Sequence, residues 1–331
     1  MTAITRSLCP ALVALACWAG AHAQLVHPDY QQLTAAFKYD RNAPLDVRQA
    51  TASQQGGATV YDLTYASTKG VRAPAYLVVP AGKGPFAAVL WGHWMMEGSP
   101  LRNRKEFLDE AIALAPAGVV SLMIDTPMVR PGYVEKDLKT DPLGWAIQMS
   151  EDGRQMVIDL RRGLDLLLRR SDVDPKRVAY VGHSFDAHVG AILAGVEKRI
   201  TNFVLMANTY SDEDFVRHSK APEMVVWREQ LGDVRMNQYF HDYAWDDAVY
   251  FVSHTEKNAI FLQFATGDHT TLEETRDELA RFSATDKQAK LYEAAHALDA
   301  AARLDRDRWL QQHLKLGNIN EKALNGLPQL Q

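Results

Sequence analysis

Continuous apolar runs and amphipathic stretches alternate along most of this chain. Runs of mostly apolar residues, typical of strands buried on both faces of a sheet, lie at residues 86–91, 119–124, 178–181, 203–206, 260–264 and 289–292. Between and after them, apolar residues at helical spacing predict helices at 105–115, 157–168, 187–196, 272–282 and 298–314. This alternation predicts an α/β fold, in which a mostly parallel sheet of about eight strands has helices on both faces. Functional sites in such sheets lie beyond the carboxyl ends of the strands.

A lead-in precedes the regular alternation, and two stretches interrupt it. Residues 24–56 predict a polar, partly helical lead-in, and two short β-like runs follow at 59–65 and 75–79. The interruptions at 127–150 and 209–258 predict small insertions that form a cap over the site. Peripheral packing that is remote from any ligand remains the alternative for both insertions.

Residues 1–23 have the pattern of a secretory signal peptide. Arg6 supplies a positive charge, residues 8–20 form a short apolar run, and Ala21-His22-Ala23 is a small-residue cleavage pattern. Cleavage after this motif predicts a secreted or periplasmic protein whose single domain is residues 24–331. A buried N-terminal helix is the alternative. In the mature chain, no apolar stretch is long enough to span a bilayer.

Composition and charge exclude several classes of protein. A net charge of -5 and a pI near 6.1 predict no basic surface for nucleic acid and no strong attraction to anionic membranes. Both cysteines, Cys9 and Cys17, lie in the signal segment, so the mature chain has no thiol for a disulfide, a nucleophile or a metal site. His183 and His188 lack metal-ligand spacing. We therefore expect no metal and no other cofactor, while the oligomeric state stays undetermined.

A candidate nucleophile follows the apolar run at 178–181. That run leads directly into Gly182-His183-Ser184-Phe185-Asp186, and a helix is predicted next. The motif resembles the G-x-S-x-G nucleophile elbow of the α/β-hydrolase superfamily, in which a sharp turn presents a serine hydroxyl at a helix N-terminus. The Gly84-Pro85-Phe86 turn before a buried strand resembles the dienelactone-hydrolase-like and acetyl-esterase-like serine esterases, and the similarity covers about residues 59–314. An exposed serine in an ordinary turn is the alternative.

The resemblance implies a catalytic triad in the chain order serine, acid, histidine. Ser184 is the expected nucleophile, Asp268 follows one buried strand as the expected acid, and His296 follows the last strand as the expected base. A serine hydroxyl is a poor nucleophile at neutral pH, so it needs such a base and the base needs an orienting partner. Glu273 and Glu274 remain alternative acids. A merely packed or helix-capping histidine remains the alternative for His296.

The resemblance also implies an oxyanion hole and a substrate pocket. The backbone N–H of Phe185 is the expected first oxyanion donor. The second is expected from the loop after the first buried strand, as the N–H of either His93 or Trp94. Trp94, Met95 and Trp245 are expected to contact the substrate, although burial in the core is an equal alternative for Trp94 and Met95.

These features predict a secreted serine hydrolase that cleaves a small-molecule carboxylic ester through an acyl-enzyme. Two alternatives stay open: a peptidase of the prolyl-oligopeptidase kind, and a catalytically inactive binding protein on the same fold. Asp186 motivates the second, because it stands where the resembling enzymes have a glycine. We expect its carboxylate to point outward or to strain the turn, and its negative charge to slow catalysis.

Overall fold

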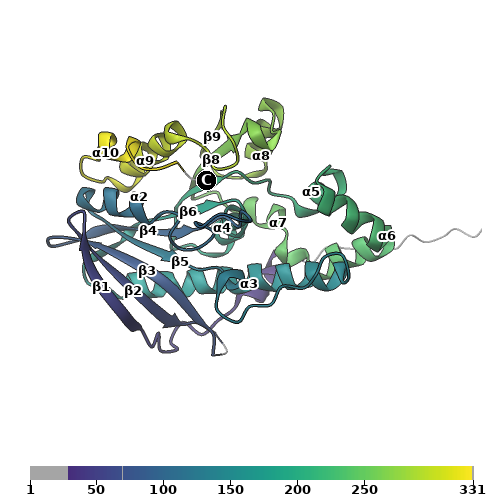
Figure 1. The fold of residues 1–331 in the computed structure, drawn as a ribbon, viewed down its shortest axis with the longest axis horizontal. Coiled ribbons are helices and arrows are strands. Elements are labelled where there is room, and N and C mark those ends of the chain that lie inside the picture. Colours follow the sequence, from purple (N-terminus) through teal and green to yellow (C-terminus); the bar gives the residue numbers. More distant parts are fainter. Residues whose placement is uncertain (1–28, 69, 330–331) are drawn as a thin grey trace, which may run out of the picture.

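The computed structural model describes residues 29–68 and 70–329, which fold around one nine-stranded sheet (Figure 1). The strands are β1 (Arg48–Gln55), β2 (Ala58–Ala66), β3 (Arg72–Pro80), β4 (Phe86–Gly92), β5 (Val119–Ile124), β6 (Val173–His183), β7 (Asn202–Met206), β8 (Ala259–Ala265) and β9 (Asp286–Tyr292). Their order across the sheet is β1-β2-β3-β5-β4-β6-β7-β8-β9. The expected signal peptide, residues 1–23, and both cysteines lie outside the described residues.

Most of the sheet is parallel. Strands β5, β4, β6, β7, β8 and β9 run in one direction, so their carboxyl ends share one edge. Strands β1, β2 and β3 form an antiparallel wing that joins the parallel part through β5. This confirms the predicted mostly parallel sheet, with one strand more than expected. The extra strand is β1, which lies in the segment predicted to be a polar, partly helical lead-in; all eight of its residues are exposed, so no apolar pattern marks it.

Ten α-helices accompany the sheet in the described part of the chain. They are α1 (Tyr30–Thr34), α2 (Leu108–Leu114), α3 (Pro142–Leu168), α4 (Phe185–Val196), α5 (Asp212–His218), α6 (Pro222–Asp242), α7 (Val249–Val252), α8 (Leu272–Arg281), α9 (Ala300–Leu314) and α10 (Glu321–Asn325). Short 3₁₀ helices are η1 (Ala35–Phe37), η2 (Ala115–Ala117), η3 (Pro127–Val129), η4 (Ala244–Asp246) and η5 (Thr266–Asp268).

The helices form a layer on each side of the sheet, and each layer has its own apolar core (Figure 1). Leu160 of α3, Ile192 of α4 and Phe251 of α7 pack in the core on one side. Ala111 of α2 and Leu310 of α9 pack in the core on the other side. Burial on both faces explains why the central strands are continuous apolar runs.

Helix α3 is longer than its apolar stripe predicts. It begins at Pro142, where Asp141 accepts a hydrogen bond from the N–H of Gly144 as the N-cap, and it continues without a break to Leu168. The predicted insertion at 127–150 is therefore too long, because its last residues are the first turns of this helix. Those turns pack against the second insertion rather than the sheet, so their apolar pattern differs from that of residues 157–168.

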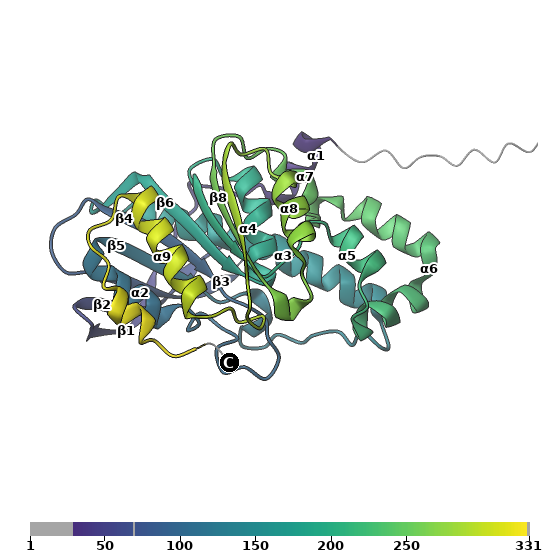
Figure 2. The same ribbon diagram turned by 90° about the horizontal axis from the view of Figure 1, so that it is seen from above.

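The second insertion, residues 209–258, contains α5, α6, η4 and α7. Trp227, Leu231, Met236 and Phe240 of α6 pack with Ala146 of α3 in a separate apolar group, which we call the cap cluster. Figure 2 shows α5 and α6 extending beyond the sheet alongside the start of α3. The cap therefore rests on one end of α3 and has its own small core.

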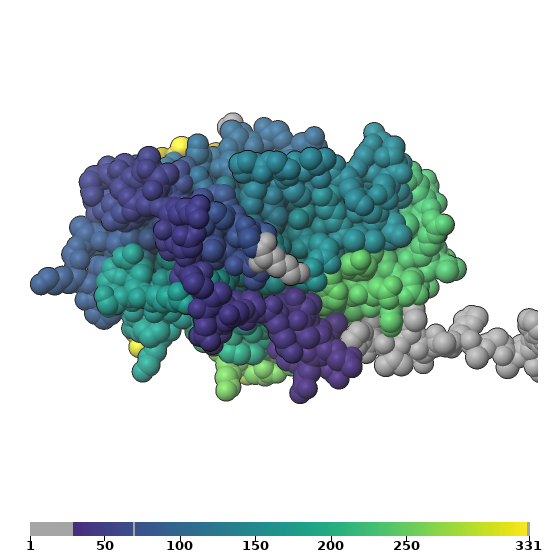
Figure 3. Space-filling model, turned by 90° about the horizontal axis from the view of Figure 1, so that it is seen from below, coloured from purple at the N-terminus to yellow at the C-terminus, as the bar shows by residue number. Residues whose placement is uncertain are grey.

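The described N-terminal segment before β1, residues 29–47, lies on the face of the molecule seen in Figure 3, where it is purple. The Tyr30 hydroxyl donates a hydrogen bond to the carbonyl of Gly195 at 2.6 Å. The buried guanidinium of Arg162 donates to the carbonyls of Ala43 and Pro44 at 2.9 and 3.0 Å. These bonds attach the segment to α3 and α4.

Candidate active site

Ser184 occupies a sharp turn between β6 and α4. Its backbone angles, φ 55° and ψ −117°, lie in a strained region that residues other than glycine rarely adopt. Its N–H donates to the carbonyl of Met206 at the end of β7 at 2.8 Å, and its carbonyl accepts from the Asn208 side chain at 2.7 Å. The surrounding strand ends thus hold the turn in a conformation that presents the side chain at the carboxyl edge of the sheet.

Two glycines make room for this turn. A Cβ atom on Gly182 would lie 2.3 Å from the carbonyl oxygen of Asp186. A Cβ atom on Gly92, at the end of β4, would lie 2.6 Å from the Cβ of Asp186 and 2.4 Å from the Tyr180 hydroxyl. The resembling enzymes have a glycine at the position of Asp186. Here the space for the Asp186 side chain comes from Gly92 on the neighbouring strand.

Asp186 is fully buried, so of the two expected arrangements, an outward-pointing carboxylate or a strained turn, the first is wrong. Within the described parts of the chain, neither carboxyl oxygen has a hydrogen-bond partner, although the His93 backbone N–H faces the group. Burial, together with the nearby Glu106 carboxylate, raises the pKa of Asp186 well above its usual range. Burial therefore favours the protonated form of Asp186, which weakens the basis for the expected slowing of catalysis by its negative charge.

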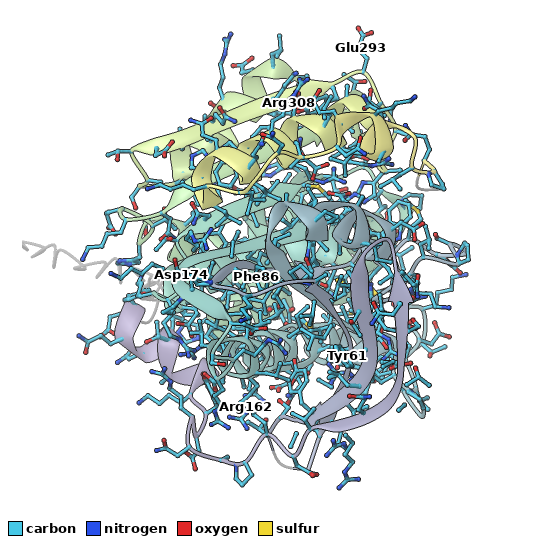
Figure 4. All side chains as sticks on the ribbon, turned by 90° about the vertical axis from the view of Figure 1, so that its left-hand side faces the viewer. Tyr61, Phe86, Arg162, Asp174, Glu293 and Arg308 are labelled. Atoms are coloured by element: carbon cyan, nitrogen blue, oxygen red, sulfur yellow. The ribbon has the colours of Figure 1, made fainter. Side chains whose placement is uncertain are left out.

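Asp268 and His296 are hydrogen-bonded to each other. The Nδ1 atom of His296 lies 2.9 and 3.0 Å from the two carboxylate oxygens of Asp268. Asp268 ends the 3₁₀ turn after β8, and His296 lies in the loop after β9, so the two loops leave adjacent strands. A Cβ on Gly267 would lie 2.8 Å from the carbonyl oxygen of Ala294, which means that a glycine is needed where these loops meet. Figure 4 shows Glu293 pointing away from the molecule at the start of the second loop.

The loop that carries His296 also contacts the turn that carries Ser184. The ring of His183, the residue before Ser184, donates from Nε2 to the carbonyl oxygen of His296 at 2.9 Å. The rings of His183 and His296 stack with centroids 5.3 Å apart. The three residues expected as a triad therefore lie on adjoining loops at one edge of the sheet, while Glu274 is engaged in the N-cap of α8.

The three expected oxyanion donors have different surroundings. Phe185 is the first residue of α4, so its N–H has no acceptor within the helix. The N–H of Trp94 is already donated to a carboxylate oxygen of Glu106 at 2.6 Å. The His93 N–H faces Asp186. Burial lowers the pKa of His93 to about 4, and its neutral ring accepts from the N–H of Thr126 at 3.0 Å.

The three residues expected to contact substrate have different surroundings. Trp94 is buried, and its ring is parallel to that of His296 with centroids 6.4 Å apart. Met95 is partly buried and contacts Thr126. Trp245 packs against other aromatic and cationic side chains, namely Phe37, Tyr243 and Arg154. A role in substrate binding remains a prediction for all three.

An acidic group beside α4 was not found from the sequence. His188 of α4 approaches Asp212 of the cap at 3.4 Å and lies 2.7 Å from the carbonyl oxygen of Asp246. Burial raises the pKa of Asp212 to about 7 and that of Asp246 to about 6. Although burial alone lowers it, the pKa of His188 is raised by these carboxylates and Asp247. These residues come from separate elements, so no spacing in the sequence marks them.

No group of three or more His, Cys, Asp or Glu side chains is arranged to hold a metal ion within residues 29–68 and 70–329. Over the same residues, no helix has the length and apolar character needed to cross a membrane.

The chain resembles solved esterase structures. No protein-family model and no curated protein sequence matches it. An acetyl xylan esterase from Paenibacillus sp. R4 superposes with a TM-score of 0.68 at 17% identity, over 86% of this chain and 92% of that chain. Acetyl xylan esterase 1 from Thermoanaerobacterium sp. JW/SL YS485 superposes with a TM-score of 0.68 at 18% identity, over 87% of this chain and 94% of that chain. A cold-adapted esterase from an Arctic intertidal metagenomic library superposes with a TM-score of 0.56 at 14% identity, over 81% of this chain and 99% of that chain.

At these identities the similarity establishes the fold. The nine-stranded sheet with its parallel part, flanking helices and strand-to-helix serine turn is the α/β-hydrolase fold, as the sequence resemblance implied. Because many reactions occur on this fold, the activity has to be argued from the site itself.

Proposed function

We propose that this protein is a carboxylic ester hydrolase in which Ser184, His296 and Asp268 act as a catalytic triad. One observation carries the proposal: the strained Ser184 turn and the hydrogen-bonded His296–Asp268 pair lie on adjoining loops at the carboxyl edge of one sheet. A base oriented by a carboxylate, next to a serine held in strained geometry, is the arrangement that activates a hydroxyl for acyl transfer.

The proposed reaction has two steps. His296 Nε2 takes the Ser184 proton as the hydroxyl oxygen bonds to the ester carbonyl carbon, and it then gives that proton to the departing alcohol. Asp268 holds Nδ1 and stabilises the imidazolium. Water, deprotonated by His296, then attacks the acyl-enzyme, which releases the acid and restores the Ser184 hydroxyl. No step in this scheme requires a cofactor.

We assign the oxyanion hole to the N–H groups of Phe185 and His93. The N–H of Phe185 lies at the N-terminus of α4, where the helix dipole also favours negative charge. His93 is preferred over Trp94 as the second donor because the Trp94 N–H is bonded to Glu106, whereas neither Asp186 oxygen is hydrogen-bonded to the His93 N–H that faces it. Because burial favours the protonated form of Asp186, its side chain would repel a developing oxyanion less than a carboxylate does.

The test is hydrolysis of p-nitrophenyl esters of graded acyl length by the purified protein, with acetyl first because two of the structural neighbours are acetyl xylan esterases. Ser184→Ala should abolish turnover, together with labelling by a fluorophosphonate probe, while the fold is kept. Labelling of Ser184→Ala at the wild-type rate, or wild-type protein that is neither active nor labelled, would disprove the proposal. Peptide amides assayed beside the esters distinguish a peptidase from an esterase.

We further propose that residues 1–23 are removed on export, and that residues 24–331 form one catalytic domain with the cap at 209–258. The sequence Ala21-His22-Ala23 supports this cleavage site. Mass spectrometry of protein from the periplasm or medium should find Gln24 at the N-terminus. Exported protein that still begins at Met1 would contradict the proposal.

A further inference from the structure

A buried chain of hydrogen bonds joins the loop after β4 to the loop that carries His296. The N–H of Trp94 donates to Oε2 of Glu106 at 2.6 Å. The Oε1 atom of Glu106 lies 2.6 Å from Nδ1 of His183, and Nε2 of His183 lies 2.9 Å from the carbonyl oxygen of His296. The side chains of Glu106 and His183 are 0% exposed, so water does not compete for these bonds.

The donor and acceptor chemistry of the partners determines where the hydrogens lie in this series of hydrogen bonds. A carbonyl oxygen only accepts, so Nε2 of His183 must carry a hydrogen. The contact between Nδ1 of His183 and Glu106 also needs a hydrogen, on one side or the other. The pair therefore shares one proton and is neutral overall, either as imidazolium and carboxylate or as imidazole and carboxylic acid. A neutral, fully bonded pair is the arrangement that a buried site tolerates.

Ring stacking adds to these bonds. Trp94 stacks on His183 with centroids 5.1 Å apart and an angle of 23°, and His183 stacks on His296 at 5.3 Å and 22°. The His296 residue is thus held at three places: its Nδ1 by Asp268, its carbonyl by His183, and one face of its ring by the same histidine. Only the first of these contacts belongs to the triad.

We infer that Glu106 and His183 are positioning residues, which hold the His296 backbone and ring where Nε2 reaches the Ser184 hydroxyl. This inference rests on the proposed function. It assigns to His183, the residue before Ser184, the role of holding His296 in place. Neither side chain touches the reacting atoms in the proposed mechanism. Because a displacement of about 1 Å in a reacting group costs on the order of 100-fold in rate, loss of the chain should lower kcat by about 10- to 100-fold with little change in KM.

The variant Glu106→Gln separates hydrogen bonding from charge. A glutamine can accept the Trp94 N–H at its oxygen and donate from its amide nitrogen to Nδ1 of His183, whose Nε2 hydrogen still reaches His296. All three bonds survive with a neutral imidazole. Glu106→Leu removes the bonds, and Glu106→Leu combined with His183→Phe leaves an apolar pair that keeps the ring stacking and folds without an unpaired histidine.

Glu110→Gln is the matched control. Glu110 lies four residues further on and is also buried, but its carboxylate binds Arg306 of α9 instead of a residue of the Trp94–Glu106–His183 series of hydrogen bonds. This variant should lower the melting temperature without changing kcat or KM per folded enzyme. Active enzyme is counted by fluorophosphonate titration, so that loss of folded protein is not mistaken for loss of rate.

The experiment measures kcat, KM and the fluorophosphonate labelling rate for all four variants on one aryl ester. We expect Glu106→Leu and the double variant to lose about 10- to 100-fold in kcat and in labelling rate, and Glu106→Gln to stay within about threefold of wild type. Near wild-type kcat in Glu106→Leu or in the double variant would overturn the inference, as would an equal loss in Glu106→Gln. Wild-type activity that depends on Ser184 secures the proposed function separately, so either failure can be recognised.

Discussion

Replacing Asp186 by alanine tests how a carboxyl group is accommodated inside the elbow. The group is completely buried, and the described residues provide no hydrogen bond to either oxygen. Burial and then the Glu106 carboxylate raise its pKa far above the ordinary value of 3.8. The folded protein therefore holds this proton to a higher pH than the unfolded chain does.

This difference in proton binding sets the size of the effect. A carboxyl group whose pKa is raised in the folded state contributes stability below the pKa of the unfolded chain, and that contribution is lost as pH rises toward the folded pKa. Between these two values, wild type loses about 1.4 kcal/mol of unfolding free energy per pH unit from this one group. Asp186→Ala has no such loss. Its stability relative to wild type should therefore rise with pH above the pKa of the unfolded chain.

The assay is urea unfolding of both proteins at pH 5, 6 and 7, followed by tryptophan fluorescence. Other titrating groups cancel in the difference, because they are present in both proteins. Asp186→Asn keeps the size and polarity but cannot titrate, so it should show the same pH dependence as alanine. A difference that stays constant with pH would show that Asp186 is ionised in the folded state. If Asp186 stays protonated over the pH range of activity, the acidic limb of the pH–rate profile does not move in either variant.

Three further predictions concern the site. Asp268→Asn should lower kcat by about 10⁴-fold in steady-state ester hydrolysis, because Asp268 acts through His296 Nδ1. The fold should persist, because the Asp268 side chain is 27% exposed. A kcat near that of wild type would indicate that Glu273 is the acid instead. Gly267→Ala places a Cβ atom 2.8 Å from the carbonyl oxygen of Ala294, so it should displace the His296 loop and lower kcat at least about tenfold. Unchanged kcat and KM would show that the Asp268 and His296 loops are not tightly packed. Asp212→Asn should gain stability relative to wild type as pH rises from 5 to 8, because desolvation raises the pKa of Asp212 to about 7. The Asp212 side chain is only partly buried, with 39% of it exposed, so solvent screening makes the gain measured by urea unfolding smaller than that pKa implies.

The buried parts of the fold could be predicted from the sequence because burial leaves a periodic signal. The run at 119–124 matches β5 residue for residue, and α4 begins two residues before the predicted helix. Strand β1 gives no such signal, since its eight exposed residues are held by backbone hydrogen bonds to β2 alone. The start of α3 was missed for a related reason, because its apolar residues face the cap rather than the sheet.

In the candidate site, too, the residues marked by a local pattern could be predicted, whereas contacts between distant residues could not. Ser184, Asp268 and His296 each follow a strand, so a resemblance in motif and chain order was enough to propose them. The surroundings of Asp186 and the bond between Glu106 and His183 depend on contacts between residues far apart in the chain, 77 positions in the second case. Local patterns carry no information on such pairs, so the sequence leaves open whether Asp186 points outward or strains the turn, and it indicates no partner for His183.

The Asp186 side chain occupies space that a larger residue at position 92 would need, and this limits the order in which the two positions can change in evolution. A side chain at position 92 would collide with Asp186, within 2.6 to 2.8 Å of its Cβ and Cγ atoms. An ancestor with glycine at the elbow and a larger residue at 92 would therefore have had to shrink position 92 before it accepted a carboxyl group at 186. A lineage returning to the glycine elbow must lose Asp186, and the Tyr180 hydroxyl at 2.4 Å must also give way, before position 92 can take a larger residue. The two sites are thus epistatic, and substitutions at either one are neutral or damaging according to what the other already holds.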